Sequence, residues 1–278
     1  MNDYNKINYS EYVGLVKETN RPSGGIKTVQ NVCVNAFIDE TKKVLEIGCN
    51  TGFTSLNISR LTNATVIGID LVDKSIEEAK KRAKSENMNK VDFFKASATE
   101  LPFKEESFDV VWLSNVLSFI EDKPKALKEC LRVLKKNGFL VLVPIYYIKN
   151  PPKEVVNKIE EAIGTKINIR SKNEWINFIR GFPVSTEIIH NEDYVYENVS
   201  NNIEEFLEDV FKKEDLEILD KEDLETLKEK GNYFMRLFNE NLKYAGYSIF
   251  IIQKRGFKEE IELFLTIENE TRENKIRG

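Results

Sequence analysis

The segment from residue 43 to residue 56 constrains the fold of this chain more than any other stretch. A short apolar run, residues 43–47, predicts a buried strand, and a helical pattern begins at Phe53. Gly48 and Gly52 bracket the turn between them. A strand that feeds such a turn and then a helix directs free backbone N–H groups at a ligand. We therefore expect a ligand site, with Gly48 allowing the tight turn and Gly52 leaving room for a ligand where a Cβ would intrude.

Two kinds of nucleotide site compete for this segment. The dinucleotide fingerprint G-x-G-x-x-G fails, because Asn50 takes the middle position and Phe53 and Ser55 lie around the last. The stretch instead resembles motif I of the class I S-adenosylmethionine (SAM)-dependent methyltransferases, in the variant where Asn replaces the middle glycine. An acid two residues before the first glycine suits the ammonium and sulfonium of SAM better than a pyrophosphate. The resemblance implies a cofactor site at Glu46, Gly48, Cys49, Asn50 and Gly52, and a βα turn that binds nothing is the alternative.

The order of apolar runs and helical patterns predicts an α/β fold. Further strands are expected at residues 65–70, 91–95, 108–113 and 139–145, with helical patterns between them. The helix before the last of these strands is expected to end at Gly138. Such alternation implies a parallel sheet with helices on both faces. The resemblance adds a further helix and an antiparallel hairpin, which gives a doubly wound, mainly parallel, Rossmann-like sheet of seven strands in the order 3-2-1-4-5-7-6.

Polar residues follow the second and third predicted strands. Asp70 lies roughly 20 residues after the first glycine, where a strand-end carboxylate meets a ribose, and Leu71 is placed to lie against adenine. Ser75 with Glu78 predicts a capping box for the next helix. After the third strand, Ser97 stands where many methyltransferases have an aspartate that takes the adenine amino group. We therefore expect adenine to be held mainly by stacking and by the backbone around Ala98, before Leu101-Pro102-Phe103.

The acceptor end of the site is less defined by the sequence. Ser114 and Asn115 follow the fourth strand and are expected to face the methionine end of SAM or the acceptor, unless they only cap a helix. Tyr146, Tyr147, His190 and Asn115 are the candidates for assisting catalysis near the sheet edge. His190 is the one group poised to titrate near neutral pH, although a histidine at a strand end is more often structural. The tyrosines are expected to line the pocket.

Composition and charge exclude several classes. The 278 residues are 41% hydrophobic and 31% charged, which suits one large or two small globular domains. The net charge of −5 argues against nucleic acid as the main partner. The longest apolar run, residues 139–148, is too short to span a bilayer, and the polar start lacks a secretory apolar region. Three separated cysteines and a single histidine predict a reduced, cytoplasmic protein without a metal site.

Several segments exceed the minimal fold. We expect an N-terminal cap segment at residues 1–27, a SAM-binding core at 28–150, completion of the sheet at 151–254 and a tail at 255–278. Within the tail, residues 261–265 form a short apolar run. Residues 191–242 are predicted to form a helical lid over the acceptor, because long insertions in compact domains are usually functional or mobile; a homodimer surface is the alternative.

The combined pattern predicts transfer of a methyl group from SAM to a small-molecule or short-peptide acceptor, leaving S-adenosylhomocysteine (SAH). In-line displacement needs alignment of donor and nucleophile rather than a fixed catalytic signature. Two alternatives stay open: a non-catalytic interaction subunit with the same fold, and a nicotinamide oxidoreductase.

Overall fold

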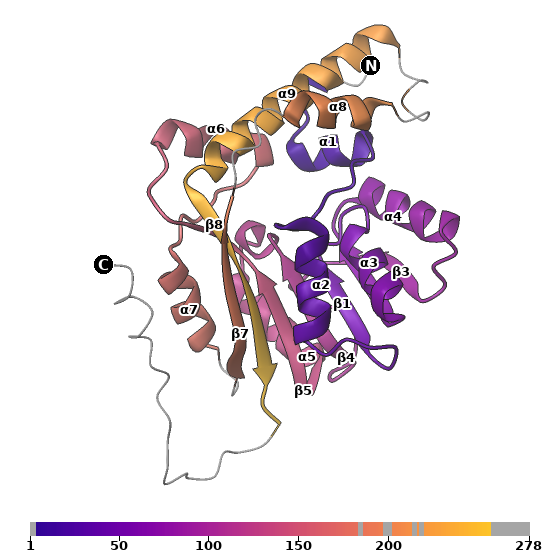
Figure 1. Ribbon diagram of the computed structural model, residues 1–278, viewed down its shortest axis with the longest axis vertical. Coiled ribbons are helices and arrows are strands. Elements are labelled where there is room, and N and C mark those ends of the chain that lie inside the picture. The colour runs from indigo at the N-terminus through magenta and orange to yellow at the C-terminus, as the bar shows by residue number, and fades with distance from the viewer. Residues whose placement is uncertain (1–3, 183–185, 197–201, 213–215, 217–219, 257–278) are drawn as a thin grey trace.

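A mixed β-sheet forms the centre of the molecule (Figure 1). The computed structural model describes residues 4–182, 186–196, 202–212, 216 and 220–256. Within them the sheet has eight strands in the order β3-β2-β1-β4-β5-β8-β6, with β7 pairing with β8. The strands are β1 (Lys43–Ile47), β2 (Thr65–Asp70), β3 (Val91–Lys95), β4 (Phe108–Ser114), β5 (Leu134–Val143), β6 (Ile145–Tyr147), β7 (Thr186–Val195) and β8 (Ala245–Lys254).

The predicted seven-strand order is confirmed once β5 and β6 are counted together. Both pair antiparallel with β8, β5 with its second half and β6 with its first, and Pro144 separates them. Proline has no N–H for the ladder, so the strand is interrupted there. Strands β1 to β5 pair in parallel and β7 pairs antiparallel with β8. The parallel strands therefore all end at one edge, here called the carboxyl edge.

Helices cover both faces of the sheet, as predicted. One face packs against α2 (Gly25–Asn35), α3 (Phe53–Thr62) and α4 (Asp73–Ser85) through residues such as Val32, Leu56 and Ile76. The other packs against α5 (Lys123–Val133) and α7 (Lys172–Arg180) through Leu127 and Trp175. The apolar stripe of each helix, spaced at three and four residues, faces the sheet and stabilises the two layers.

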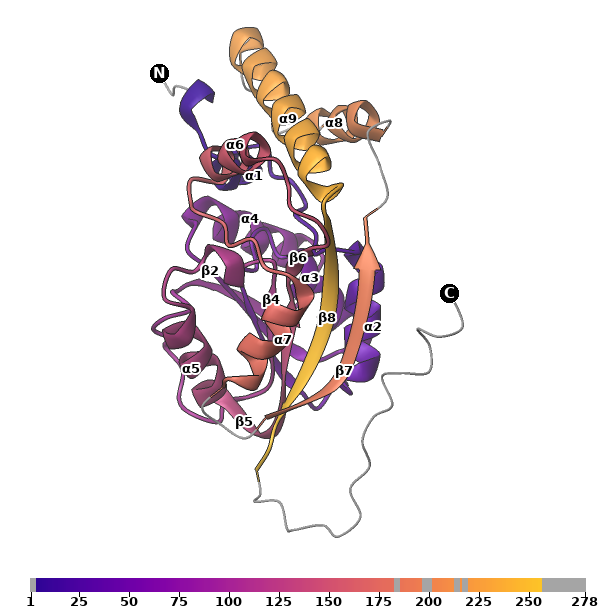
Figure 2. The ribbon, with the colours of Figure 1, turned by 90° about the vertical axis from the view of Figure 1, so that its left-hand side faces the viewer.

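A separate helical cluster lies beyond the carboxyl edge (Figures 1 and 2). It combines α1 (Tyr9–Leu15), α6 (Lys153–Ile163), α8 (Ile203–Phe211) and α9 (Lys221–Leu242), which share a hydrophobic core. Tyr9 and Tyr12 of α1 pack edge-to-face on Phe234 of α9. The N-terminal tyrosines thus contact the insertion helices, and whether the cluster acts as a lid stays a prediction.

Three local expectations differ from the structure. Gly138 lies within β5 rather than ending α5, which already stops at Val133; a Cβ there would lie 2.8 Å from the carbonyl oxygen of Asp109. Ser75 is not a cap, because α4 begins at Asp73. Residues 191–195 belong to β7, so the insertion begins after them. The apolar run 261–265 falls outside the described residues.

None of the described helices combines the length and apolar character that a membrane span requires. Among the described residues, no three His, Cys, Asp or Glu side chains are placed to share a metal ion.

Candidate functional site

The glycine turn after β1 is held by hydrogen bonds within the protein. The N–H groups of Gly48 and Cys49 both donate to the carbonyl of Ile69, at 2.8 and 3.0 Å. Asn50 N–H donates to Asp70 Oδ2 at 2.9 Å, and Thr51 N–H to the Asn50 side chain at 2.8 Å. Gly52 N–H donates to the carbonyl of Cys49. The expectation of free N–H groups was wrong for residues 48–52, so this turn is not built to cradle a pyrophosphate.

Both glycines of the turn have a left-handed backbone, with φ of +75° at Gly48 and +89° at Gly52. This conformation confirms why the tight turn needs them. A Cβ on Gly48 would lie 2.7 Å from the Val116 side chain, and one on Gly52 would lie 2.8 Å from the Phe93 ring. The expectation that Gly52 makes room for a ligand is therefore corrected: the space around its Cα is occupied by core side chains.

Glu46 and Cys49 lie inside the protein rather than at its surface. Glu46 Oε2 accepts hydrogen bonds from the N–H and hydroxyl of Ser55, in the first turn of α3. Burial raises the pKa of the Glu46 carboxyl to about 7, although the bonds from Ser55 and Thr54 oppose the shift. The Cys49 side chain is buried in the core beside α3. Glu46 thus fastens α3 to β1, and contact of either residue with SAM stays a prediction.

Asp70 lies where β2 ends beside the glycine turn. Its Oδ2 accepts from Asn50 N–H, and its Oδ1 accepts from Val72 N–H at 3.0 Å. A carboxylate offers about four acceptor positions, so each oxygen keeps one for a ligand hydroxyl. The residue is half-buried and the adjacent Leu71 is 64% exposed. Asp70 therefore retains the capacity to accept from two ribose hydroxyls.

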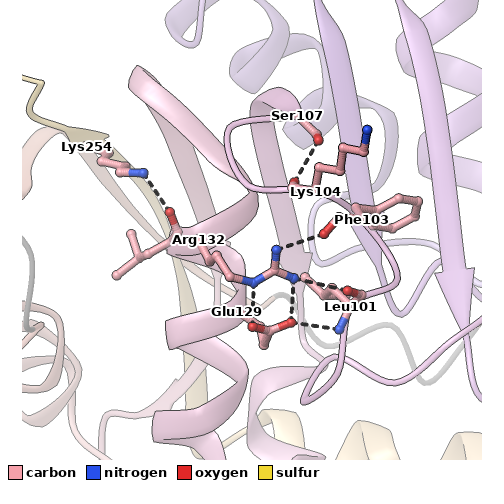
Figure 3. Close-up of polar contacts among 8 residues, drawn as sticks. Leu101, Phe103, Lys104, Ser107, Glu129, Arg132 and Lys254 are labelled. Carbon is pink, nitrogen blue, oxygen red and sulfur yellow. Dashed lines mark hydrogen bonds and ion pairs between the residues drawn. The ribbon is translucent and has the colours of Figure 1, made fainter.

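The loop after β3 is fixed by an ion pair from α5 (Figure 3). Arg132 donates to the carbonyls of Leu101 and Phe103 at 3.0 and 2.8 Å and also binds Glu129, which accepts from Leu101 N–H. The Arg132 contact lowers the pKa of the Glu129 carboxyl. Charge-assisted bonds of this kind are the strong ones, so the loop that begins at Ser97 is anchored at its far end.

Ser97 uses its hydroxyl locally. Its Oγ lies 2.9 Å from Thr99 Oγ1 and accepts from Thr99 N–H at 3.2 Å. Ala98 is buried in the core on the α5 side of the sheet. Ser97 therefore shapes a turn next to the tip of β2, where Ala96 N–H donates to the carbonyl of Asp70.

The tip of β4 brings together segments that are far apart in the chain. Asn115 has a φ of +57°, and its Oδ1 accepts from the Ser23 hydroxyl at 3.1 Å. The Ser23 hydroxyl lies 2.5 Å from the Tyr196 hydroxyl. Ser114 Oγ is buried without a hydrogen-bond partner among the described residues. Because an orphaned buried hydroxyl is costly, Ser114 is suited to meet a polar ligand group.

Residues 16–24, within the segment 1–27 that was predicted as an N-terminal cap, form a strap across the glycine turn, and its contacts were not predicted. Thr51 Oγ1 donates to the carbonyl of Glu18 at 2.6 Å, and Arg82 of α4 donates to the carbonyl of Lys17 at 2.7 Å. The Arg21 guanidinium lies over the Phe53 ring. These bonds join residues 33 to 65 positions apart. No spacing rule links such residues.

Tyrosines gather beside the tips of β6 and β8. Burial is the main cause that raises the pKa of the Tyr146, Tyr147 and Tyr196 hydroxyls, and Asp193 contributes at Tyr146. Tyr147 donates to Asn241 Oδ1 of α9 at 3.2 Å. These phenols keep their protons near neutral pH and are suited to donate hydrogen bonds rather than to remove a proton.

His190 lies in the middle of β7, away from the other predicted site residues. It pairs with Ile251 of β8 and stands level with Glu46, with β4, β5 and β8 between them. Four strand spacings amount to roughly 19 Å. Its buried Nε2 has no hydrogen-bond partner among the described residues and lies 3.8 Å from Glu192. This position favours a structural role.

The structure therefore gathers most predicted residues at the carboxyl edge. Those at or beside it are Gly48, Asn50, Gly52, Asp70, Leu71, Ser97, Ala98, Ser114, Asn115, Tyr146 and Tyr147. Their arrangement combines a half-buried carboxylate, a buried hydroxyl without a hydrogen-bond partner among the described residues, and several protonated tyrosine hydroxyls. Such a set fits a hydroxyl-rich ligand with a polar end better than it fits a pyrophosphate.

Known proteins are similar to the part of the chain that contains most of these residues. Residues 45–142 match the family model described as a methyltransferase domain. Methyltransferase GfsG of Streptomyces halstedii is 30% identical over 137 residues, and the alignment covers 49% of each chain. The 27-O-demethylrifamycin SV methyltransferase of Amycolatopsis mediterranei is 33% identical over 110 residues, which cover 39% of this chain and 40% of that one. This chain thus spans about half or less of these two relatives.

A solved structure covers more of the chain. The crystal structure of MccD protein aligns with 85% of this chain and all of its own, with a TM-score of 0.70 and 22% identity. At that identity the match concerns the fold. It extends the similarity beyond residues 45–142.

Proposed function

Because this chain carries a methyltransferase domain of the class I SAM-dependent superfamily, we propose that it binds SAM at the carboxyl edge and methylates a small-molecule acceptor. When bound, SAM supplies a methyl carbon already activated by its positively charged sulfur. The observation that carries the proposal is Asp70, whose two oxygens each keep an acceptor position beside the glycine turn.

The residues around Asp70 divide the remaining work. Leu71 and the Ser97–Ala98 turn would hold adenine, the first by an apolar contact and the second by its backbone. Ser114 and Asn115, at the tip of β4, would hold the methionine end. The closed hydrogen bonds of the glycine turn disfavour a nicotinamide dinucleotide, whose pyrophosphate needs free N–H groups.

The acceptor would enter between the strap and the tyrosines. Ser23, Asn115 and Tyr196 form a hydrogen-bonded set there. Holding the acceptor's nucleophilic atom about 3 Å from the methyl carbon supplies roughly 7–11 kcal/mol of the barrier reduction. The acceptor's nucleophilic atom would take the methyl group that SAM supplies, the sulfur would keep the electron pair of the broken carbon–sulfur bond, and any acceptor proton would leave to solvent or to a neighbouring group. The protonated tyrosines would orient the acceptor as donors.

Calorimetry with SAM and SAH tests this proposal, with NADH as the control ligand. We expect one saturable site for SAM and SAH and no heat from NADH above dilution. Absence of heat from all three would refute the proposal and favour a non-catalytic interaction protein. Binding of NADH alone would favour an oxidoreductase. Mass spectrometry of the purified protein then identifies any retained SAH or acceptor.

A further inference from the structure

Three side chains form a hydrogen-bonded chain between the strap and the tip of β4. The Ser23 hydroxyl donates to Asn115 Oδ1 at 3.1 Å and lies 2.5 Å from the Tyr196 hydroxyl. Because the one proton of the Ser23 hydroxyl is used on Asn115, its contact with Tyr196 requires that the phenol donate. If Ser23 donated to Tyr196 instead, the phenol proton would have no acceptor among the described residues. The bonds therefore run from Tyr196 through Ser23 to the amide oxygen of Asn115.

The surroundings of Ser23 and Tyr196 hold both residues in place. Thr28 Oγ1 donates to the carbonyl of Ser23 at 2.6 Å, and Ser23 is 9% exposed. The Tyr196 ring packs on the Tyr247 ring of β8, with centroids 5.4 Å apart. Tyr247 also lies against Gly24, where a Cβ would come within 2.2 Å of the phenol oxygen. The two donors are thus positioned by α2 and β8.

The orientation of the Asn115 amide follows from these bonds. Its oxygen accepts from Ser23, so its NH₂ group points away from Ser23. Within the described part of the chain, no atom accepts a hydrogen bond from that NH₂ group. Asn115 lines a small hollow at the tips of β4 and β5, together with Ser118 and Pro144. The backbone N–H of Asn115 donates to the carbonyl of Val143 at 3.0 Å. Asn115 is therefore a fixed residue with a free donor group beside the hollow.

The tip of β4 lies within reach of a ligand bound at Asp70. Ile47 of β1 pairs with Ile69 of β2 and with Leu113 of β4. The next residues, Asp70 and Ser114, therefore lie level with each other at the carboxyl edge. Two strand spacings separate them, which is roughly 10 Å. The amino acid chain of SAH extends over a comparable length from its ribose, so its charged end would arrive at the tip of β4.

That charged end carries an ammonium and a carboxylate, which need opposite partners. An amide NH₂ group donates to a carboxylate, whereas an ammonium needs an acceptor. We propose that Ser23 and Tyr196 are positioning residues that hold the Asn115 NH₂ group toward the carboxylate of the cofactor, so that the site selects for this carboxylate. The inference rests on the proposed function, because it concerns the same cofactor.

Calorimetry with two ligands tests the selection. SAH carries both charged groups, whereas its decarboxylated analogue, S-adenosyl-3-thiopropylamine, keeps the ammonium and lacks the carboxylate. We expect wild type to bind SAH about tenfold or more tightly than the analogue, because a hydrogen bond to a charged group is stronger than one between neutral groups. The ratio of the two Kd values is the readout, because a substitution that only loosens the site weakens both ligands alike.

Asn115→Asp should reverse this preference. Aspartate keeps one oxygen for the bond from Ser23 and replaces the NH₂ group by a negatively charged oxygen. The Kd for SAH should rise about thirtyfold or more, because a carboxylate now faces the carboxylate of the ligand. The analogue should bind at least as tightly as it binds to wild type.

Ser23→Ala and Tyr196→Phe test the positioning. The first removes the donor to Asn115, and the second leaves the Ser23 hydroxyl free to rotate. Each should raise the Kd for SAH about fivefold to tenfold and change the Kd for the analogue by less than about twofold. Tyr194→Phe is the matched control, because the Tyr194 hydroxyl bonds to Glu192 instead, and it should bind both ligands as wild type does. Unfolding midpoints verify that each variant is folded, and Tyr196→Phe decides if Ser23→Ala is unstable.

Three results would overturn the inference while SAH still binds. They are equal affinity of wild type for the two ligands, an unchanged ratio of Kd values in both Ser23→Ala and Tyr196→Phe, and a folded Asn115→Asp variant with the wild-type preference. Each of them leaves the proposed function intact. Absence of SAH binding to wild type would instead refute the proposed function, and this inference with it.

Discussion

Replacement of Asp70 by Asn is the substitution that most directly probes the proposed ribose contact. In the native protein each carboxylate oxygen accepts one backbone N–H, from Asn50 and from Val72, and keeps one acceptor position. Asparagine has nearly the same shape, but only its amide oxygen can accept hydrogen bonds. Its NH₂ group would replace the second carboxylate oxygen and would face groups that are themselves donors. The change thus removes the charge and one of two acceptor groups, and the NH₂ also loses the backbone hydrogen bond from either Asn50 or Val72.

The expected loss follows from the two ribose hydrogen bonds. A bond to a charged group contributes about 1.5–3 kcal/mol, against about 0.5–1.5 kcal/mol for a neutral one. Losing the charge from two bonds costs about 2 kcal/mol, and a mismatched NH₂ adds up to about 1 kcal/mol. These values correspond to a Kd for SAH raised about 30-fold to 150-fold.

Isothermal titration calorimetry with SAH measures this change. Asp73→Asn is the matched control, because Asp73 lies three residues after Asp70 and carries the same charge. Its carboxylate belongs to an exposed ion pair with Lys95. That variant should bind SAH within about twofold of wild type. An Asp70→Asn protein with native stability and a Kd within threefold of wild type would refute the ribose assignment.

Three further outcomes are expected from urea unfolding. Gly52→Ala should lower the free energy of unfolding by about 2–4 kcal/mol, because it adds a clash in the core to backbone strain. Gly25→Ala is the control: its φ is +58° and its Cβ would point into open space, so it should lower the free energy of unfolding by about 1 kcal/mol. Equal losses in the two variants would contradict this expectation. The pKa of the Glu46 carboxyl is raised to about 7 in the folded protein, so wild type should lose stability as the pH rises from 4.5 to 7. Relative to Glu46→Gln, its free energy of unfolding should fall by up to about 3 kcal/mol over this range. A difference between the two proteins that does not change with pH would argue against burial of the charge. Gly231→Ala should destabilise the protein by about 1–3 kcal/mol, since the new Cβ would lie 2.2 Å from the Tyr12 hydroxyl. Adding Tyr12→Phe should recover much of that loss. If the losses from the two substitutions simply added in the double variant, the contact would be refuted.

The parallel half of the fold could be predicted because its signals are local. Strands β1, β2 and β3 begin and end at the predicted residues, since each is a short apolar run ended by a turn. Asp70 was located by its distance from the first glycine, and its place beside the turn is confirmed. Gly138 was misassigned to a helix end, because a glycine required by close backbone approach has the same sequence signature as one that stops a helix.

The acceptor side was harder to predict because its contacts join distant segments. Ser23, Asn115 and Tyr196 come from three parts of the chain and meet only in the folded state. The distance of His190 from the edge depends on strand register, including the irregularity between Ile188 and His190, which composition does not reveal. Division of the chain into cap, core, lid and tail stays a prediction.

A crystal structure of the complex with SAH would show directly whether Asp70 binds the ribose. Both ribose hydroxyls are expected about 3 Å from the Asp70 carboxylate, with adenine between Leu71 and the turn at Ser97. A nucleoside bound elsewhere, with Asp70 bonded only to Asn50 and Val72, would contradict it.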